Sequence, residues 1–168
     1  MTIESNPQMP VFWKRAVLWV VVLEVAGNSS GLITFWSKDW YASLVRPPGT
    51  PPDGSFGPVW LFLFAMMGIA AALVSSAERE GPVGLRRKKA LRWFGAQFLA
   101  NMAWTPAFFG FHRIDFALVI ILLLLLFLAV TIWRFGKLSR GAAFLLVPYL
   151  VWVAYAAYLN AGFWWLNR

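Results

Sequence analysis

An uninterrupted apolar run from Phe116 to Trp133 constrains this chain more than any other feature. It reads FALVIILLLLLFLAVTIW and carries no charge. As a helix rising 1.5 Å per residue it would cover about 27 Å, most of the ~30 Å hydrocarbon thickness of a bilayer. Hydrophobic residues make up 60% of the chain and the mean hydropathy is +0.64, more than the core of a soluble domain needs. The sequence therefore predicts an integral membrane protein.

Four breaks divide the chain into five candidate spans. Helices are expected, because lipid cannot satisfy backbone N–H and C=O groups and the alternating pattern of a membrane barrel is absent. Lys14 and Arg15 before an apolar run also resemble a secretory signal, but the run is too long, contains Glu24 and lacks a clear cleavage site. We expect an all-α membrane protein, one five-helix transmembrane domain over residues 1–168, with helices at about 12–35, 57–77, 91–111, 116–134 and 141–165.

Loop charge predicts the orientation. With five spans, the N-terminus shares a side with the second and fourth connections, and that side collects 11 of the 15 basic residues. The positive-inside rule then places the N-terminus in the cytoplasm. The net charge of +8 needs no nucleic acid partner, since its densest run abuts a span, where anionic lipid headgroups are the expected contact. That run is Arg86-Arg87-Lys88-Lys89.

The longest connection, residues 36–56, lies on the charge-poor side. Four prolines remove backbone donors and forbid regular helix there: Pro47, Pro48, Pro51 and Pro52. Such a segment can cover the mouth of the bundle, or its Trp36, Trp40 and Tyr41 can form an interfacial aromatic belt. Composition alone leaves both interpretations open.

Aromatic and polar residues inside the spans indicate either packing or a cavity. The chain has eleven tryptophans, and Trp60, Trp104 and Trp152 fall within spans, where they can pack between helices or line a site for a flat apolar ligand. A polar stripe recurs at every fourth residue of span three, and it either joins helices or faces a cavity. Its members are Gln97, Asn101 and Thr105, with Asn160 and Glu24 as expected partners, and Pro106 and Pro148 bend two helices nearby.

A series of motifs resembles the translocator protein family, also called tryptophan-rich sensory proteins or the TspO/MBR family. The motifs follow the family's order over residues 36–160. They are Trp40-Tyr41-x-x-Leu44-x-Arg46-Pro47-x-x-x-Pro51-Pro52, Phe56-Gly57-Pro58-Val59-Trp60, Gln97-x-x-x-Asn101-x-x-Trp104-Thr105-Pro106-x-Phe108-Phe109-Gly110, Pro148-Tyr149-Leu150-x-Trp152 and Leu159-Asn160.

The resemblance implies a five-helix bundle, usually a homodimer, with a pocket covered by the first loop; a bacterial cell membrane is the favoured location. It implies binding of protoporphyrin or a haem-type tetrapyrrole, with no resident cofactor and no metal. Carried over by motif, the ligand-binding residues are Tyr41, Trp60, Phe64, Asn101, Trp104, Thr105, Tyr149, Trp152 and Ala156.

The resemblance leaves three functional classes open. A receptor or transporter would hold a tetrapyrrole reversibly, and a regulatory protein would signal its loaded state to a partner. An enzyme would degrade porphyrin with light and oxygen, using Trp60 and Trp152 as catalytic indoles. The sequence shows no Gly-rich phosphate loop, paired catalytic carboxylates or serine triad, which argues against nucleotide-driven or hydrolytic work. The absence of cysteine excludes disulfides and a cysteine nucleophile.

Two positions depart from the family pattern. Gly49 stands where the family usually has Trp between the loop prolines, and Ala161 replaces an aromatic of the animal sterol-recognition pattern, so no dedicated sterol site is expected there.

His112, the lone histidine, is expected at a membrane edge and not as a haem ligand. Small residues of span three predict a homodimer face: Gly95, Ala96, Ala100 and Ala103.

Overall fold

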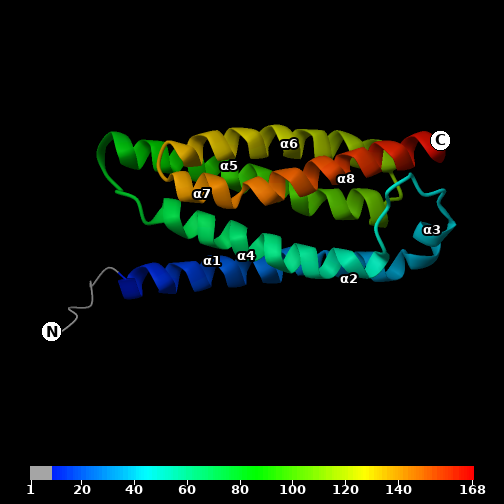
Figure 1. Ribbon diagram of the computed structural model, residues 1–168, viewed down its shortest axis with the longest axis horizontal. Helices are drawn as coiled ribbons and strands as arrows, with labels where there is room; N and C mark the ends of the chain where they lie inside the picture. The colour runs from blue at the N-terminus through cyan, green and yellow to red at the C-terminus, as the bar shows by residue number, and fades with distance from the viewer. Residues whose placement is uncertain (1–8) are drawn as a thin grey trace.

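The structure is a computed structural model that describes residues 9–168, and every regular element within that range is helical. The long helices run along one common axis (Figure 1). Five helices have 20 or more residues: α1 (Met9–Ser29), α4 (Phe56–Ser75), α5 (Gly81–Thr105), α6 (Ile114–Gly136) and α8 (Val147–Leu166). The shorter elements are α2 (Gly31–Trp36), α3 (Lys38–Ser43), the 3₁₀ helix η1 (Asp53–Ser55), the π-helix η2 (Pro106–Gly110) and α7 (Arg140–Leu145).

Four helical segments of the described chain are long and apolar enough to cross a membrane: Val11–Trp36, Asp53–Ser75, Ile114–Gly136 and Arg140–Leu166. They make this a multi-pass integral membrane protein. The predicted third span, 91–111, is not confirmed. Helix α5 begins at Gly81, ten residues earlier than predicted, so it contains the basic run from Arg86 to Lys89 and is less apolar than the other four.

Helix packing brings the basic connections together. Helix α1 packs along α4, α5 along α6, and α6 along α8, with α7 against α4 and α6. The start of α1 and the α4–α5 and α6–α7 connections lie at one end of the bundle, and α3 and the C-terminus lie at the other (Figure 1). The basic residues that the sequence assigned to one side therefore share one end. Which membrane face this end meets stays a prediction.

The predicted long loop at 36–56 is not confirmed as one irregular segment. Residues Lys38–Ser43 form α3 and Asp53–Ser55 form η1, which leaves only Ser37 and residues 44–52 without helix. The prolines account for the irregular part, because they remove donors and restrict the preceding residue. The α3 helix instead depends on tertiary contacts, since Trp40 and Tyr41 pack against Phe108 of η2.

The two prolines within spans interrupt helices as predicted. After Pro106 the backbone hydrogen bonds change from the four-residue spacing of an α-helix to a five-residue spacing. The Phe111 N–H donates to the Pro106 carbonyl over 2.8 Å. Such π-turns are frequent at functional sites. Pro148 lies in the first turn of α8, and the chain breaks between α7 and α8 at Leu146. A proline in that position lacks only a donor that a helix start leaves free.

Glycine permits a close contact between α1 and α4. A Cβ on Gly68 of α4 would lie 2.7 Å from both the backbone N and Cα of Val20 in α1. Backbone atoms cannot rotate away as a side chain can. Gly68 therefore sets the α1–α4 distance, and the core packed beside it includes the buried residues Leu23, Leu63, Phe64 and Met67.

We predict that Gly68→Ala lowers the free energy of unfolding by about 1–3 kcal/mol, because overpacking pushes α1 from α4. Thermal melting in detergent, followed by circular dichroism, measures the effect. Gly57→Ala on the same helix is the control, since a Cβ there meets nothing within 4 Å. Equal melting temperatures for the two variants would contradict this packing role.

Candidate ligand-binding site

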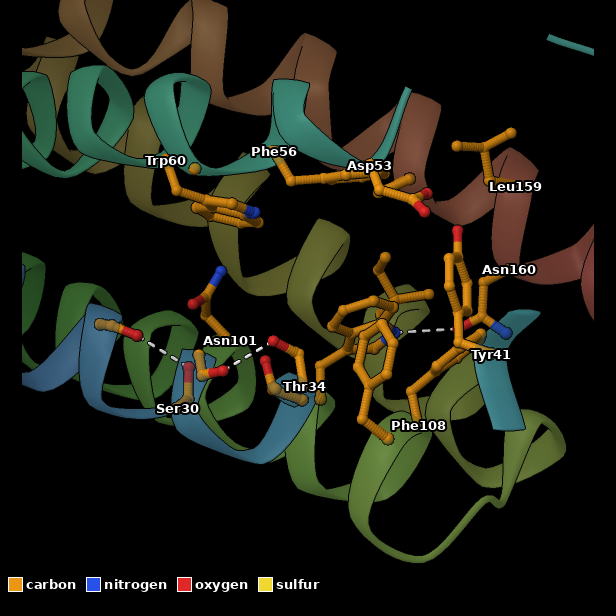
Figure 2. Close-up of a pocket in the computed structure, with 18 of the residues that line it drawn as sticks. Ser30, Thr34, Tyr41, Asp53, Phe56, Trp60, Asn101, Phe108, Leu159 and Asn160 are labelled. Atoms are coloured by element: carbon orange, nitrogen blue, oxygen red, sulfur yellow. Dashed lines mark hydrogen bonds between the residues drawn. The ribbon is translucent and has the colours of Figure 1, made fainter. Parts of the chain in front are cut away.

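A cavity of about 670 Å³ lies toward the end of the bundle that carries α3. Side chains from opposite helices converge on it; Figure 2 shows Trp60 of α4 and Asn101 of α5 pointing toward one another across the space. The volume lies in the range of sites that enclose drug-sized ligands. Its lining is drawn from α1, α2, α3, η1, α4, α5, η2, α6 and α8.

Eight of the nine ligand-binding residues predicted from the sequence line this cavity: Tyr41, Trp60, Phe64, Asn101, Trp104, Thr105, Trp152 and Ala156. The ninth, Tyr149, lies behind the lining and is fully buried. The Asn101 Nδ2 donates to the Tyr149 hydroxyl over 2.8 Å. Tyr149 therefore orients a lining amide and does not itself face the cavity.

Aromatic rings form the walls. Trp60 stacks on Phe64 with ring centroids 5.2 Å apart, and Trp104 stacks on Phe108 at the same distance. Trp152 meets Phe56 edge to face, with centroids 6.0 Å apart. Offset and edge-to-face pairs are the favoured aromatic geometries, and their exposed faces suit a flat apolar ligand.

The polar residues of the spans both join helices and border the cavity. The Trp104 Nε1 donates to the Asn160 Oδ1 over 2.9 Å, and the Asn160 Nδ2 donates to the Ile114 carbonyl, which ties α5 to α8 and α6. The sequence left open whether these polar residues join helices or face a cavity. Asn101 and Asn160 do both, since each bonds a neighbouring helix and each lines the cavity.

Two residues of the expected polar set lie elsewhere. Gln97 is fully buried but does not line the cavity, and its amide has no hydrogen-bond partner in the described chain. Glu24 accepts from Asn28 of its own helix over 2.8 Å, so the expectation that it joins the stripe on α5 is wrong. Four-residue spacing makes that local pair available without a second helix.

Helix α3 closes one side of the cavity. Lys38, Asp39, Tyr41 and Ala42 all line it. The Ser37 hydroxyl just before α3 donates to the Phe109 carbonyl of η2 over 2.6 Å, and Tyr41 packs on Phe109 with centroids 5.4 Å apart. Trp36 is 79% exposed, as a belt residue would be. Tyr41 therefore borders the cavity and Trp36 does not, and the assignment of a cover and a belt stays a prediction.

The proline segment is tied to α8. The Tyr158 hydroxyl donates to the Pro48 carbonyl over 3.1 Å, the Tyr155 hydroxyl donates to the Gly49 carbonyl, and Asn167 bonds both backbone groups of Val45. Gly49 has φ +82°, a conformation that L side chains rarely adopt. A Trp at this position would therefore require the segment to change its backbone.

Charges at the cavity mouth are partly paired. Arg46 and Asp53 form an ion pair at 3.0 Å, and the hydrogen bond to Asp53 raises the pKa of Arg46. Burial raises the pKa of Tyr41, an effect that nearby Arg46 opposes and Asp53 reinforces. Tyr41 therefore stays protonated at neutral pH and keeps a hydroxyl donor at the cavity wall.

Sequence reasoning missed several lining residues. Phe108, Phe109 and Phe163 complete the wall next to α3, and Ser30 and Thr34 lie opposite Trp60. Pro106 was the available signal for the first two, because the π-helix after it turns both rings toward the cavity side.

His112 packs at the rim of the α3 end. Its ring stacks on Trp40 at 4.1 Å, and its backbone has φ +55°. No group of three or more His, Cys, Asp or Glu side chains that could hold a metal ion occurs among the described residues.

Comparison with known proteins agrees with this architecture. The model of the TspO/MBR family matches residues 18–166. The tryptophan-rich protein TspO of Chlorobaculum tepidum is 40% identical over 131 residues, covering 76% of this chain and 79% of that protein. Protein CrtK of Rhodobacter capsulatus is 34% identical over 150 residues, covering 89% and 91%. The translocator protein of Ovis aries is 37% identical over 135 residues, covering 77% and 75%.

These matches and the helical fold define a class of polytopic membrane protein with an aromatic cavity. The chain belongs to the TspO/MBR family. The resemblance inferred from the tryptophan and proline motifs is confirmed.

We predict that Ser37→Ala loosens the cover, because it removes the side-chain bond that holds the start of α3 to η2. A net hydrogen-bond contribution of about 0.5–1.5 kcal/mol corresponds to amide exchange faster by roughly two- to tenfold. Hydrogen exchange of the α3 amides, read by mass spectrometry, measures it. Ser43→Ala is the control, since the Ser43 hydroxyl bonds only within α3, to the Trp40 carbonyl. Unchanged exchange in Ser37→Ala would show that aromatic packing alone holds α3.

Proposed function

We propose that this protein is a receptor- or transporter-like membrane protein that binds protoporphyrin and related tetrapyrroles, with a role in tetrapyrrole handling or stress sensing. The observation that carries the proposal is the cavity of about 670 Å³ bordered by Trp60, Trp104 and Trp152. A planar macrocycle exposes large aromatic faces, and each stacked ring contributes on the order of 1 kcal/mol beyond area burial. The names of the relatives, sensory and translocator proteins, fit reversible binding.

The distribution of polar groups supports an amphipathic ligand. Asn101 and Thr105 border the inner part of the cavity, and Lys38 lies with Asp39 and Asp53 where α3 and η1 cover it. Lys38 forms no ion pair in the described chain; its ammonium lies 4.3 Å from the Phe35 ring centroid. A tetrapyrrole would place its ring among the indoles and its carboxylates toward this mouth.

The proposed topology is one domain with five transmembrane helices and a cytoplasmic N-terminus. Four spans are apolar enough on their own, and α5 would be the fifth. Its long packing against α6 supports this, with the basic first turns at the headgroups and the predicted span 91–111, which continues through η2, in the hydrocarbon. The segment from Trp36 to Phe56 would cover the ligand.

A second candidate function is light- and oxygen-dependent porphyrin degradation. Trp60 and Trp152 border the same cavity from α4 and α8, which favours it. Both indoles would then contact one bound macrocycle, and oxidation by photo-generated oxygen species would involve them as catalytic residues. Reversible binding and degradation both begin with the same porphyrin-bound protein. Illumination of that complex in oxygen therefore distinguishes the two functions.

The proposed assembly is a homodimer through α5. Ala103 and Leu99 are exposed on this helix, and a Cβ on Gly95 would meet nothing within 4 Å. Ala96 and Ala100 are half-buried, and Ala100 also packs against the protein's own core. Small residues let a second helix approach closely in a membrane.

We predict that protoporphyrin quenches tryptophan fluorescence saturably, near one per protomer, and that Trp152→Ala weakens binding by roughly tenfold through the loss of a stacked wall. Fluorescence titration in detergent measures both. Trp165→Ala is the control, because Trp165 is 61% exposed and lies outside the cavity lining. Linear quenching without saturation would indicate partition into detergent and overturn the proposal.

The titrated sample is then illuminated in oxygen. Recovery of unchanged porphyrin supports the receptor or transporter. Bleaching with a protein-dependent product that Trp60→Phe and Trp152→Phe both suppress supports degradation.

We predict that Ala103→Leu shifts the protein from dimer to monomer in detergent, because the larger side chain prevents close approach. Light scattering coupled to size exclusion measures the mass. Val151→Leu, on the exposed face of α8, is the matched control and should stay dimeric. An unchanged mass for Ala103→Leu would reject this interface.

A further inference from the structure

A cluster of cations and indoles lies on the outer wall between α5 and α6, at the end of the bundle opposite α3. The Arg134 guanidinium carbon lies 5.8 Å from the Trp93 ring centroid and 5.6 Å from that of Trp133. The Lys137 Nζ lies 3.6 Å from the Trp133 centroid. We call the surface formed by Trp93, Trp133, Arg134 and Lys137 the α5–α6 basic groove.

The charges of this groove lack a counter-ion among the residues that the structure describes. The two ion pairs of the described chain, Arg46–Asp53 and Arg113–Asp115, lie elsewhere. The Arg134 Nε is buried and has no hydrogen-bond partner among the described residues. Glu78 and Glu80, on the connection at the same end of the bundle, are exposed and form no ion pair with the groove. The terminal Nη atoms of Arg134 likewise bond none of the described residues, and they, unlike the buried Nε, can reach an external acceptor.

Helical spacing adds further cations on the α5 side. Lys89 and Arg86 lie four and seven residues before Trp93, so they share its face of the helix, and both are exposed. The aromatic contacts Trp93–Phe127 and Phe94–Phe135 hold α5 and α6 together at this level. The groove therefore has basic side chains on both of its walls.

The groove continues into an apolar surface of bilayer dimensions. The side chains of Phe116, Val119, Leu122, Leu123, Leu126 and Trp133 are exposed on α6. From Phe116 to Trp133 this face covers about 27 Å, close to the ~30 Å hydrocarbon thickness. Arg134 and Lys137 follow directly at its end, where lipid phosphates lie. An acyl chain spans one leaflet, about half of this thickness, so the part of the face next to Arg134 is long enough for the acyl chains of one phospholipid.

We propose that the α5–α6 basic groove binds an anionic phospholipid, with the phosphate on Arg134 and Lys137 and an acyl chain along α6. Planar guanidinium donors match phosphate oxygens bidentately, and the flanking indoles hold the Arg134 side chain in place by cation–π contact. A net negative headgroup is favoured because Arg134 and Lys137 lie together here and Lys89 and Arg86 share the Trp93 face of α5. This inference does not depend on the tetrapyrrole proposal.

The test measures lipid selectivity by electron paramagnetic resonance. The full chain is reconstituted in phosphatidylcholine vesicles with trace spin-labelled phosphatidylglycerol or spin-labelled phosphatidylcholine, and the motionally restricted fraction of each label is compared. The unmodified protein should prefer phosphatidylglycerol, and Arg134→Gln/Lys137→Gln should lose that preference by about fivefold or more. Arg134→Lys/Lys137→Arg should retain most of it.

Controls separate a built site from general surface charge. Lys14→Gln/Arg79→Gln removes two exposed cations at the same end of the bundle, outside the groove, and should leave the preference intact. An equal loss in this variant overturns the site. So does an unchanged preference in Arg134→Gln/Lys137→Gln. If that variant fails to fold by circular dichroism, the exposed Lys137→Gln alone provides the decision.

A final arm distinguishes a lipid from free phosphate. Inorganic phosphate should displace the labelled phosphatidylglycerol no more than sodium chloride does at equal ionic strength, because the acyl chain contributes to binding. Specific displacement by phosphate would show an anion site and overturn the lipid assignment.

Discussion

Lipid offers no partner to a backbone N–H or C=O, so the protein itself must satisfy each interruption of a helix in this bundle. Near Ser30 the side chain donates to the Gly27 carbonyl over 2.7 Å, and after Pro106 a π-turn restores the ladder. The third interruption, at Leu146, is capped by bonds to Ala143 and Leu150. Ser30 itself lines the cavity, and the other two interruptions are followed by lining residues, Phe108 and Trp152. Breaks in regular helix thus surround the space in which a ligand would bind.

Close packing elsewhere makes that space possible. A Cβ on Gly27 would lie 2.3 Å from the Phe64 ring, so the absence of a side chain allows the ring to lie against α1 and form a wall. A Cβ on Gly162 would lie 2.6 Å from the Pro47 Cβ, so the proline segment rests directly on α8. Protein interiors are packed without large voids, and a cavity of this size persists only where the surrounding contacts are this tight.

The polar groups near the cavity are largely committed to the protein. The Asn101 amide donates to Tyr149, and Asn160 bonds both Trp104 and the Ile114 carbonyl. Satisfied buried networks give rigidity, because breaking one bond leaves another group unpaired. A ligand therefore meets rings held in fixed positions, and its recognition depends on shape and stacking more than on new hydrogen bonds. The opposite end of the molecule differs, since Arg134 and Lys137 have no counter-ion in the described chain.

The sequence by itself determined the membrane environment, four of the spans to within a few residues, the family and eight of the residues that line the cavity. These follow from hydropathy, proline positions and motif spacing, which are local properties of the chain. Only the tertiary structure decided that residues 38–43 form a helix against Phe108 and that Tyr149 lies behind Asn101. It also decided that α5 begins at Gly81 and carries the basic run within a helix. The physical reason is that each of these outcomes depends on which neighbour competes for a side chain, and such neighbours are brought together only when the helices pack.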